Sequence, residues 1–155
     1  MIIRVNPEDL EISTRYQHMC LQRERSFRHG CPNYGKKKGC PPRELISDVF
    51  DFSKSIYLIC TNIDLEARVK PIRESHPDWT EKAVYSPRYW QPGARKEHER
   101  EIKEFLGGHE NQYVEKTPEG ARLNVDSLCR KYGIELEWSP RKITRIIALA
   151  GERKS

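Results

Sequence analysis

Long apolar stretches are missing from this sequence. No run of about 18 consecutive apolar residues occurs, so we expect no transmembrane helix and no membrane partner. The first residues, Met1 to Asp9, lack the apolar segment of a secretory signal peptide. Without such a signal a disulfide framework is not expected, and the odd count of five cysteines agrees with this. We therefore expect a cytoplasmic protein whose thiols are reduced and available as ligands.

The sequence also lacks the short motifs of several enzyme classes. It holds no Gly-rich phosphate loop, no His-Glu-x-x-His motif and no Ser-His-Asp order. His76 and His109 lie in predicted loops with no nucleophile paired to them, and His98 is expected to be solvent-exposed on a charged helix. No catalytic residue is therefore assigned, and the sequence leaves open whether the protein is an enzyme.

Apolar residues are few, at 36% of the 155 residues, while charged residues make up 33%. A chain of this length fits one domain, residues 1–155, with a modest core. The net charge of +5 is concentrated between Leu21 and Arg43, where Glu24 is the one acidic residue and the segment carries +6. The seven basic residues of this segment are Arg23, Arg25, Arg28, Lys36, Lys37, Lys38 and Arg43.

Three of the five cysteines lie in the same basic segment. Cys20, Cys31 and Cys40 fall within 21 residues, and the last two are each followed by proline. Thiolates gathered this closely are typical of a metal or iron–sulfur site, and a Cys-Pro pair also ends bacterial ferredoxin cluster motifs. We expect residues 20–42 to form a basic loop, rich in Cys, Gly and Pro, that holds a cluster.

The residues around these cysteines suit thiolate chemistry. Neighbouring cations lower the pKa of a thiol and offset the negative charge of a thiolate-ligated cluster. Gly30, Gly35 and Gly39 allow tight turns that bring backbone N–H groups towards sulfur. A [4Fe–4S] cluster needs a fourth ligand, and if none came from the protein, one iron would be open to substrate. The candidates for a fourth ligand are Cys129 and, less favoured, Cys60, His18 and His29.

Two alternatives to an iron–sulfur cluster stay open. Structural zinc sites usually pair ligands two to four residues apart, whereas ten and eight residues separate these three cysteines and no Cys-x-x-Cys pair occurs. His18 and His29 could still complete a zinc site. In the second alternative the cysteines bind no metal and are small buried apolar residues, which is the simpler interpretation of Cys60 and Cys129.

The cysteine segment resembles an uncharacterised prokaryotic family of predicted metal-binding, iron–sulfur proteins. The family signature is a Cys, then Cys-x-x-Tyr-Gly, four residues and Cys-Pro-Pro, and the matching residues are Cys31, Tyr34, Gly35, Cys40, Pro41 and Pro42. Residues 3–12 are similar to the opening of the family, and residues 121–138 to its closing helix and strand. The resemblance implies metal binding at the amino-terminal cysteines.

The chain departs from this family at two points. Ten residues separate Cys20 from Cys31, where the family has only a few. Typical members also carry a second cysteine group in the later half, and here only Cys129 lies there. We therefore expect one cluster rather than two.

The apolar pattern predicts an α/β or α+β domain with a small mixed sheet and flanking helices. Strands are predicted over residues 2–5, 56–60, 134–138 and 143–149, with a hairpin turn between the last two. One helix is expected to begin at Pro42, a second to span 94–106 and end at Gly107-Gly108, and a third to run from Thr117-Pro118 to Gly133.

Three functional hypotheses follow, of which the third is a structural or assembly protein held together by zinc. The first is a small iron–sulfur protein in electron transfer or in sulfur and redox chemistry, with a redox or protein partner and a place in a larger complex. The second is a basic module that binds RNA or a complex, with structural cysteines or zinc. In it Arg23, Arg25, Arg28 and Lys36–Lys38 contact phosphates or the partner, and Tyr34, Trp79 and Trp90 are the rings available to stack on bases.

Overall fold

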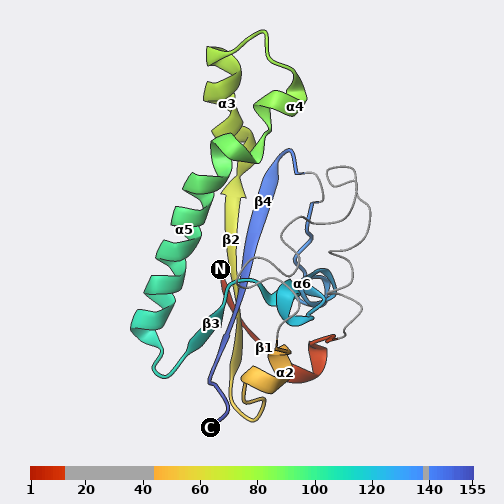
Figure 1. Cartoon of the computed structure of the whole chain (residues 1–155), viewed down its shortest axis with the longest axis vertical. Coiled ribbons are helices and arrows are strands. Elements are labelled where there is room, and N and C mark those ends of the chain that lie inside the picture. Colours follow the sequence, from red (N-terminus) through yellow and green to blue (C-terminus); the bar gives the residue numbers. More distant parts are fainter. Residues whose placement is uncertain (13–43, 138–139) are drawn as a thin grey trace.

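The computed structural model describes residues 1–12, 44–137 and 140–155. In these residues four strands form one antiparallel sheet in the order β1–β2–β4–β3 (Figure 1). The two inner strands pair along their whole length, from Ile56 opposite Gly151 to Asp64 opposite Ile143. The strands are β1 (Ile2–Val5), β2 (Ile56–Asp64), β3 (Tyr113–Glu115) and β4 (Ile143–Gly151).

Strand β2 is continuously apolar at its start because both faces of the sheet are covered. Leu58 and Cys60 face one core, while Ile59 faces the other, and all three are fully buried. The same alternation holds in β4, where Leu149 joins the core of Leu58 and Ala148 joins that of Ile59. The central strand pair is therefore the layer on which both cores are built.

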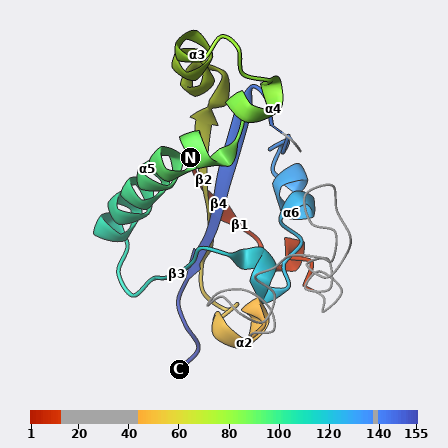
Figure 2. The ribbon, with the colours of Figure 1, turned by 45° about the horizontal axis from the view of Figure 1, so that its top comes forward.

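One face of the sheet is covered by a long helix, α5 (Pro87–Gly108) (Figures 1 and 2). Ile102 and Phe105 of α5 pack on Ile59, and the small side chains of Ala148 and Ala150 leave room for the helix. The helix starts seven residues before its predicted beginning at 94. Pro87 occupies its first turn, where proline costs no hydrogen bond, and Trp90 is buried in a neighbouring core cluster that anchors this end.

The other face is covered by short elements. These are the 3₁₀ helices η1 (Pro7–Asp9) and η3 (Pro118–Ala121) and the helices α2 (Ile46–Val49) and α6 (Val125–Lys131). Asn124 caps α6 by accepting a hydrogen bond from the Ser127 backbone N–H at 3.0 Å. Gly133, with φ of +75°, ends it in the left-handed conformation that glycine adopts most readily. Leu128 of α6 is fully buried against the sheet.

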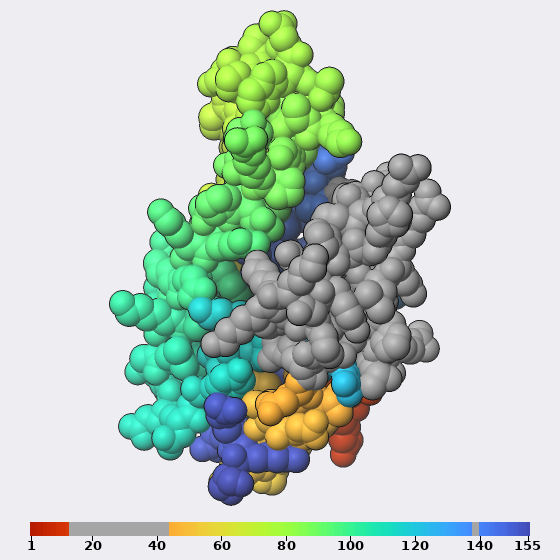
Figure 3. Space-filling view, viewed as in Figure 1, coloured from red at the N-terminus to blue at the C-terminus, as the bar shows by residue number. Residues whose placement is uncertain are grey.

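Two further helices, α3 (Leu65–Ser75) and α4 (Glu81–Val84), form a projection beyond the end of β2 and the start of β4 (Figure 3). Both have side-chain caps: Asp64 accepts from the Ala67 N–H at 3.0 Å, and Thr80 from the Ala83 N–H at 3.2 Å. A separate cluster, built from Ile63, Leu65, Val69, Val84, Trp90 and Ala94, holds this end together. The projection therefore has its own small core.

The predicted class, one α/β domain with a small sheet and flanking helices, is confirmed, and the described strand pairs are all antiparallel. The strands predicted at 2–5, 56–60 and 143–149 and the end of the long helix at Gly108 are also confirmed. The helix predicted from Pro42 is described only as α2, and Pro42 itself lies outside the described residues.

Two predicted elements in the later half are wrong. Ile134–Glu137 belong to no strand, and β4 pairs with β2 and β3 instead. Apolar and polar residues alternate in this segment because Ile134 and Leu136 pack against the core. Glu137 accepts a hydrogen bond from the Arg141 N–H at 2.6 Å. The helix predicted from Thr117 is interrupted, since Arg122 has φ of +71° between η3 and α6.

Candidate functional site

The predicted cluster ligands lie outside the described residues. The same holds for the basic side chains around them and for two of the candidate fourth ligands. The residues concerned are Cys20, Cys31, Cys40, His18, His29, Arg23, Arg25, Arg28, Lys36, Lys37 and Lys38. The site built from them therefore stays a prediction.

The other two candidate ligands, Cys60 and Cys129, lie on one face of the sheet. Cys60 is on β2 and Cys129 on α6, and both are free, fully buried members of the core opposite α5. Cys60 donates to Asn62 Oδ1 at 3.6 Å. The sequence predicted that Cys60 and Cys129 are buried apolar residues. The structure places both in the core on the same side of the sheet, on two different elements.

The surroundings of both thiols favour the protonated form. Burial raises the pKa of Cys60, and burial followed by the nearby Cys60 thiol raises the pKa of Cys129 to about 12. Arg145 acts in the opposite direction on both thiols but does not outweigh burial. Because a metal ligand must be a thiolate, either cysteine would bind a metal only if the metal displaced a tightly held proton.

Ligand clusters were sought among the residues that the structure describes. In residues 1–12, 44–137 and 140–155 no group of three His, Cys, Asp or Glu side chains is placed to hold a metal ion. No helix of this part is long and apolar enough to cross a membrane.

A buried polar group that the sequence did not predict lies between α5 and the sheet. His98 is only 4% exposed, so the expectation that it faces solvent is wrong. Its signal was present in the sequence, because Ala94, His98 and Ile102 are spaced by four and share the buried side of α5. His98 meets Thr61, a fully buried residue of β2.

The hydrogen bonds of this group fix its protonation. Thr61 Oγ1 donates to Glu101 Oε2 at 2.6 Å, so it accepts from His98 Nδ1, 2.7 Å away. The imidazole therefore carries its proton on Nδ1, and the buried Nε2 has no hydrogen-bond partner among the described residues. Burial lowers the pKa of His98; Glu99 and Glu101 oppose this shift and Lys116 adds to it.

This arrangement does not make Thr61 a nucleophile. Its proton points to Glu101, so the imidazole is not placed to remove it. The group acts instead as a hydrogen-bonded connection between β2 and α5, ending at a carboxylate that is 29% exposed.

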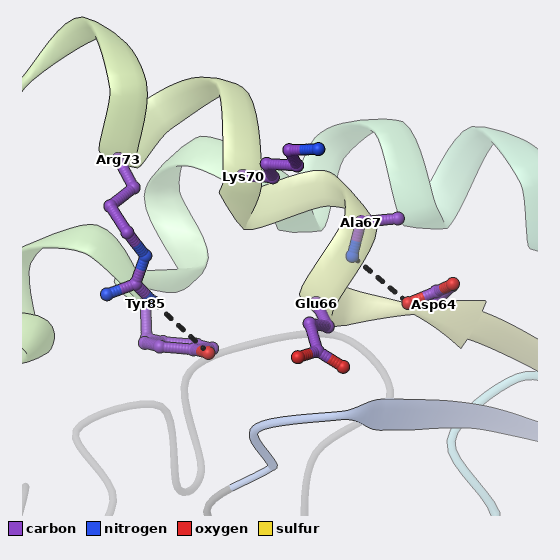
Figure 4. Close-up of a pocket in the computed structure, with 6 residues that line it drawn as sticks. All are labelled: Asp64, Glu66, Ala67, Lys70, Arg73 and Tyr85. Atoms are coloured by element: carbon purple, nitrogen blue, oxygen red, sulfur yellow. Dashed lines mark hydrogen bonds between the residues drawn. The ribbon is translucent and has the colours of Figure 1, made fainter.

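A pocket of about 520 Å³ lies at the base of the projection, between α3 and Tyr85 (Figure 4). Most of its polar side chains are already engaged. Asp64 caps α3, and Arg73 contacts both Glu81 and the Tyr85 hydroxyl. Glu66 and Lys70 line the same pocket with opposite charges. The pocket therefore offers no set of side chains converging on one chemical group.

Comparison with family models, with curated proteins and with solved structures gives no match to this chain. The resemblance to the predicted metal-binding family therefore rests on the sequence alone, on the cysteine segment and on residues 3–12 and 121–138.

Proposed function

We propose that this chain is a small iron–sulfur protein that acts in electron transfer or in sulfur and redox chemistry. Cys20, Cys31 and Cys40 would ligate one cluster, [4Fe–4S]. The observation that carries the proposal is the gathering of three cysteines within 21 residues in a segment of net charge +6. A redox or protein partner would exchange electrons or sulfur with it.

The contrast between the two groups of cysteines supports this assignment. Cys60 and Cys129 lie in an apolar core where burial raises the pKa of both thiols. The amino-terminal group has seven basic residues as sequence neighbours, and cations lower thiol pKa values. Thiolates are therefore expected in the amino-terminal segment rather than in the core.

The fourth ligand decides which chemistry the cluster performs. A cluster with four protein ligands has no open iron and suits electron transfer, whereas one with three can bind substrate at the fourth iron. Cys129 would fill the fourth position only by giving up a thiol proton held with a pKa of about 12. Because Cys129 is fully buried in the apolar core on α6, we propose an open or externally ligated fourth iron as the working hypothesis.

Quantitation of iron, zinc and acid-labile sulfide in anaerobically purified protein tests the proposal. We expect a brown protein with iron and sulfide in equal amounts. Cys31→Ser should lose the metal, and the matched Cys129→Ala variant should keep it. A colourless protein with stoichiometric zinc, or with no metal, would contradict the proposal, as would full cluster content in Cys31→Ser.

A further inference from the structure

The projection formed by α3 and α4 carries aromatic rings and arginines at its surface. We name this surface the aromatic–arginine tip. Its residues come from α3, α4, the connection between them, the first turn of α5 and the turn before β4. They are Arg73, His76, Trp79, Tyr85, Arg88, Tyr89 and Arg141.

Three of these rings form a row of contacts. The rings of His76 and Trp79 are stacked, with centroids 3.8 Å apart and planes 9° apart. Tyr89 also contacts Trp79, with ring centroids 5.2 Å apart and planes tilted by 42°. Trp79 is half-buried and packs on the small core beneath, whereas His76 is exposed and Tyr89 is 46% exposed. The row is thus anchored at its centre and open at both ends.

Guanidinium groups accompany the tyrosines of the tip. Arg141 lies 4.4 Å from the centroid of the Tyr85 ring, and Arg73 lies 5.7 Å from it. Arg88 lies 6.0 Å from the centroid of Tyr89. Arg73 is neutralised by an ion pair with Glu81, whereas no carboxylate of the described residues forms an ion pair with the side chain of Arg88 or Arg141. Arg88 beside the exposed Tyr89, and Arg141 over the half-buried Tyr85, are therefore available to a ligand.

We propose that the aromatic–arginine tip binds single-stranded nucleic acid. Unpaired bases stack on exposed aromatic rings, and arginines contact the phosphates between them. An acidic peptide would pair with the two arginines but would leave the flat faces of the ring row unused. A duplex is disfavoured for the converse reason, since its bases are already stacked on each other. Trp90 takes no part, because it is buried and donates its indole N–H to the Tyr85 carbonyl at 3.0 Å.

The charges of the projection set the expected salt dependence. Glu66, Glu74, Asp78 and Glu81 lie on the same segment, so the tip is not strongly basic. With two unpaired arginines contacting phosphates, the slope of log affinity against log salt should be about −1.4. Binding by the amino-terminal segment, which carries seven basic residues, should give a far steeper slope. Stacking should therefore supply most of the affinity of the tip.

Fluorescence anisotropy with the full-length chain tests this inference. The probes are short labelled oligouridine and oligothymidine, together with an abasic strand of equal length. We expect both base-bearing strands to bind and the abasic strand to bind at least about tenfold more weakly, because each stacked base contributes about 1–3 kcal/mol. We expect oligouridine and oligothymidine to bind with similar affinity, because ring stacking and phosphate contacts do not distinguish ribose from deoxyribose.

The variants separate the tip from other surfaces. Tyr89→Ala should weaken binding about tenfold, and Arg88→Ala should weaken it and flatten the salt slope by about 0.7. Leu106→Ala is the matched control, because Leu106 has a similar exposure of 42% and lies at the far end of the same helix. Circular dichroism and thermal unfolding confirm that each variant folds.

Three outcomes would overturn the inference. One is the absence of binding to any strand. Another is binding that Tyr89→Ala and Arg88→Ala leave within about twofold of the parent, while Lys36→Ala/Lys37→Ala/Lys38→Ala removes it. The third is equal binding of the abasic strand. None of these depends on the cluster, because the same titration in Cys31→Ser should give an unchanged affinity if the tip is the site.

Discussion

Thr61 of β2 and His98 of α5 are joined by a buried hydrogen bond of 2.7 Å between the hydroxyl and Nδ1. The bond crosses the interface of the sheet with its covering helix, beside the apolar contacts of Ile59 with Ile102 and Phe105. The Thr61 hydroxyl also donates to Glu101, so one side chain of β2 holds two side chains of α5. Four predictions follow from this group, from the glycines and from the buried thiols.

Replacing Thr61 by Val should destabilise the fold by about 1–3 kcal/mol, because the His98 N–H is left buried without an acceptor. Urea unfolding measures the change. Thr61→Ser is the control, since it keeps the hydroxyl and loses only a methyl group, at about 1 kcal/mol. Equal losses in the two variants would show that the hydroxyl is unimportant.

The buried imidazole should make the protein less stable in mild acid. Burial lowers the pKa of His98 from its ordinary value of 6.5, so the folded state resists a proton that the unfolded chain takes up. The contribution is complete above about pH 6.5 and is lost as the pH falls from there towards the lowered folded-state pKa. Urea titrations between about pH 7.5 and pH 5 should show this loss.

The variant His98→Gln provides the comparison for this pH dependence. It keeps a side chain that can donate to Thr61 but cannot titrate. Its free energy of unfolding should fall less steeply over the same pH range than that of the parent. Parallel curves for the two proteins would assign the acid sensitivity to other groups.

Gly151 should tolerate no side chain. A Cβ atom there would lie 2.8 Å from Ile56 Cδ1 and 2.9 Å from Phe50 Cδ1, and Phe50 is fully buried. We expect Gly151→Ala to cost about 1–3 kcal/mol by overpacking, measured by thermal and urea unfolding. Gly107→Ala is the control, because a Cβ at that helical position meets nothing within 4 Å and should stabilise the protein slightly. If Gly107→Ala destabilised the protein more than Gly151→Ala, the close packing inferred around Gly151 would be wrong.

Cys60 and Cys129 should resist alkylation in the folded protein. Both thiols are fully buried, and burial raises their pKa values, that of Cys129 to about 12. Because the thiolate is the reactive species, iodoacetamide at neutral pH should label them only after urea is added. Mass spectrometry of tryptic peptides identifies the labelled residues. Labelling of Cys129 in native protein at the rate of an unfolded thiol would contradict its placement.

The central strands were predictable because their apolar runs are strong local signals. Ile56 to Cys60 is apolar enough to be buried on two faces, and β4 is buried from Ile147 onward although Ile143 is 38% exposed. The start of α5 was not predictable. Pro87 and Pro92 are residues that usually indicate a break in a helix, and the burial of Trp90, which anchors this end, depends on tertiary contacts. A strand was wrongly predicted at Ile134–Glu137. The alternation of apolar and polar residues that is typical of a strand also occurs in a connecting segment that packs one side on the core.

The site was predictable only in part. The cysteine segment is a strong pattern of spacing, and its residues lie outside those described. The hydrogen bonds that join Thr61 to His98 and Glu101 connect residues far apart in the sequence. No local sequence pattern could therefore predict them. The ring row of the tip is likewise assembled by the fold, since Trp79 and Tyr89 belong to different elements.

The pairing of Ile56 with Gly151 bears on how the chain reaches its final form. During synthesis the apolar strand around residue 56 emerges long before the partner that flanks it. Contacts between such distant positions are slow to form, and an uncovered apolar edge invites association with other chains. Truncations that end before β4 should therefore leave one edge of β2 unpaired and should aggregate.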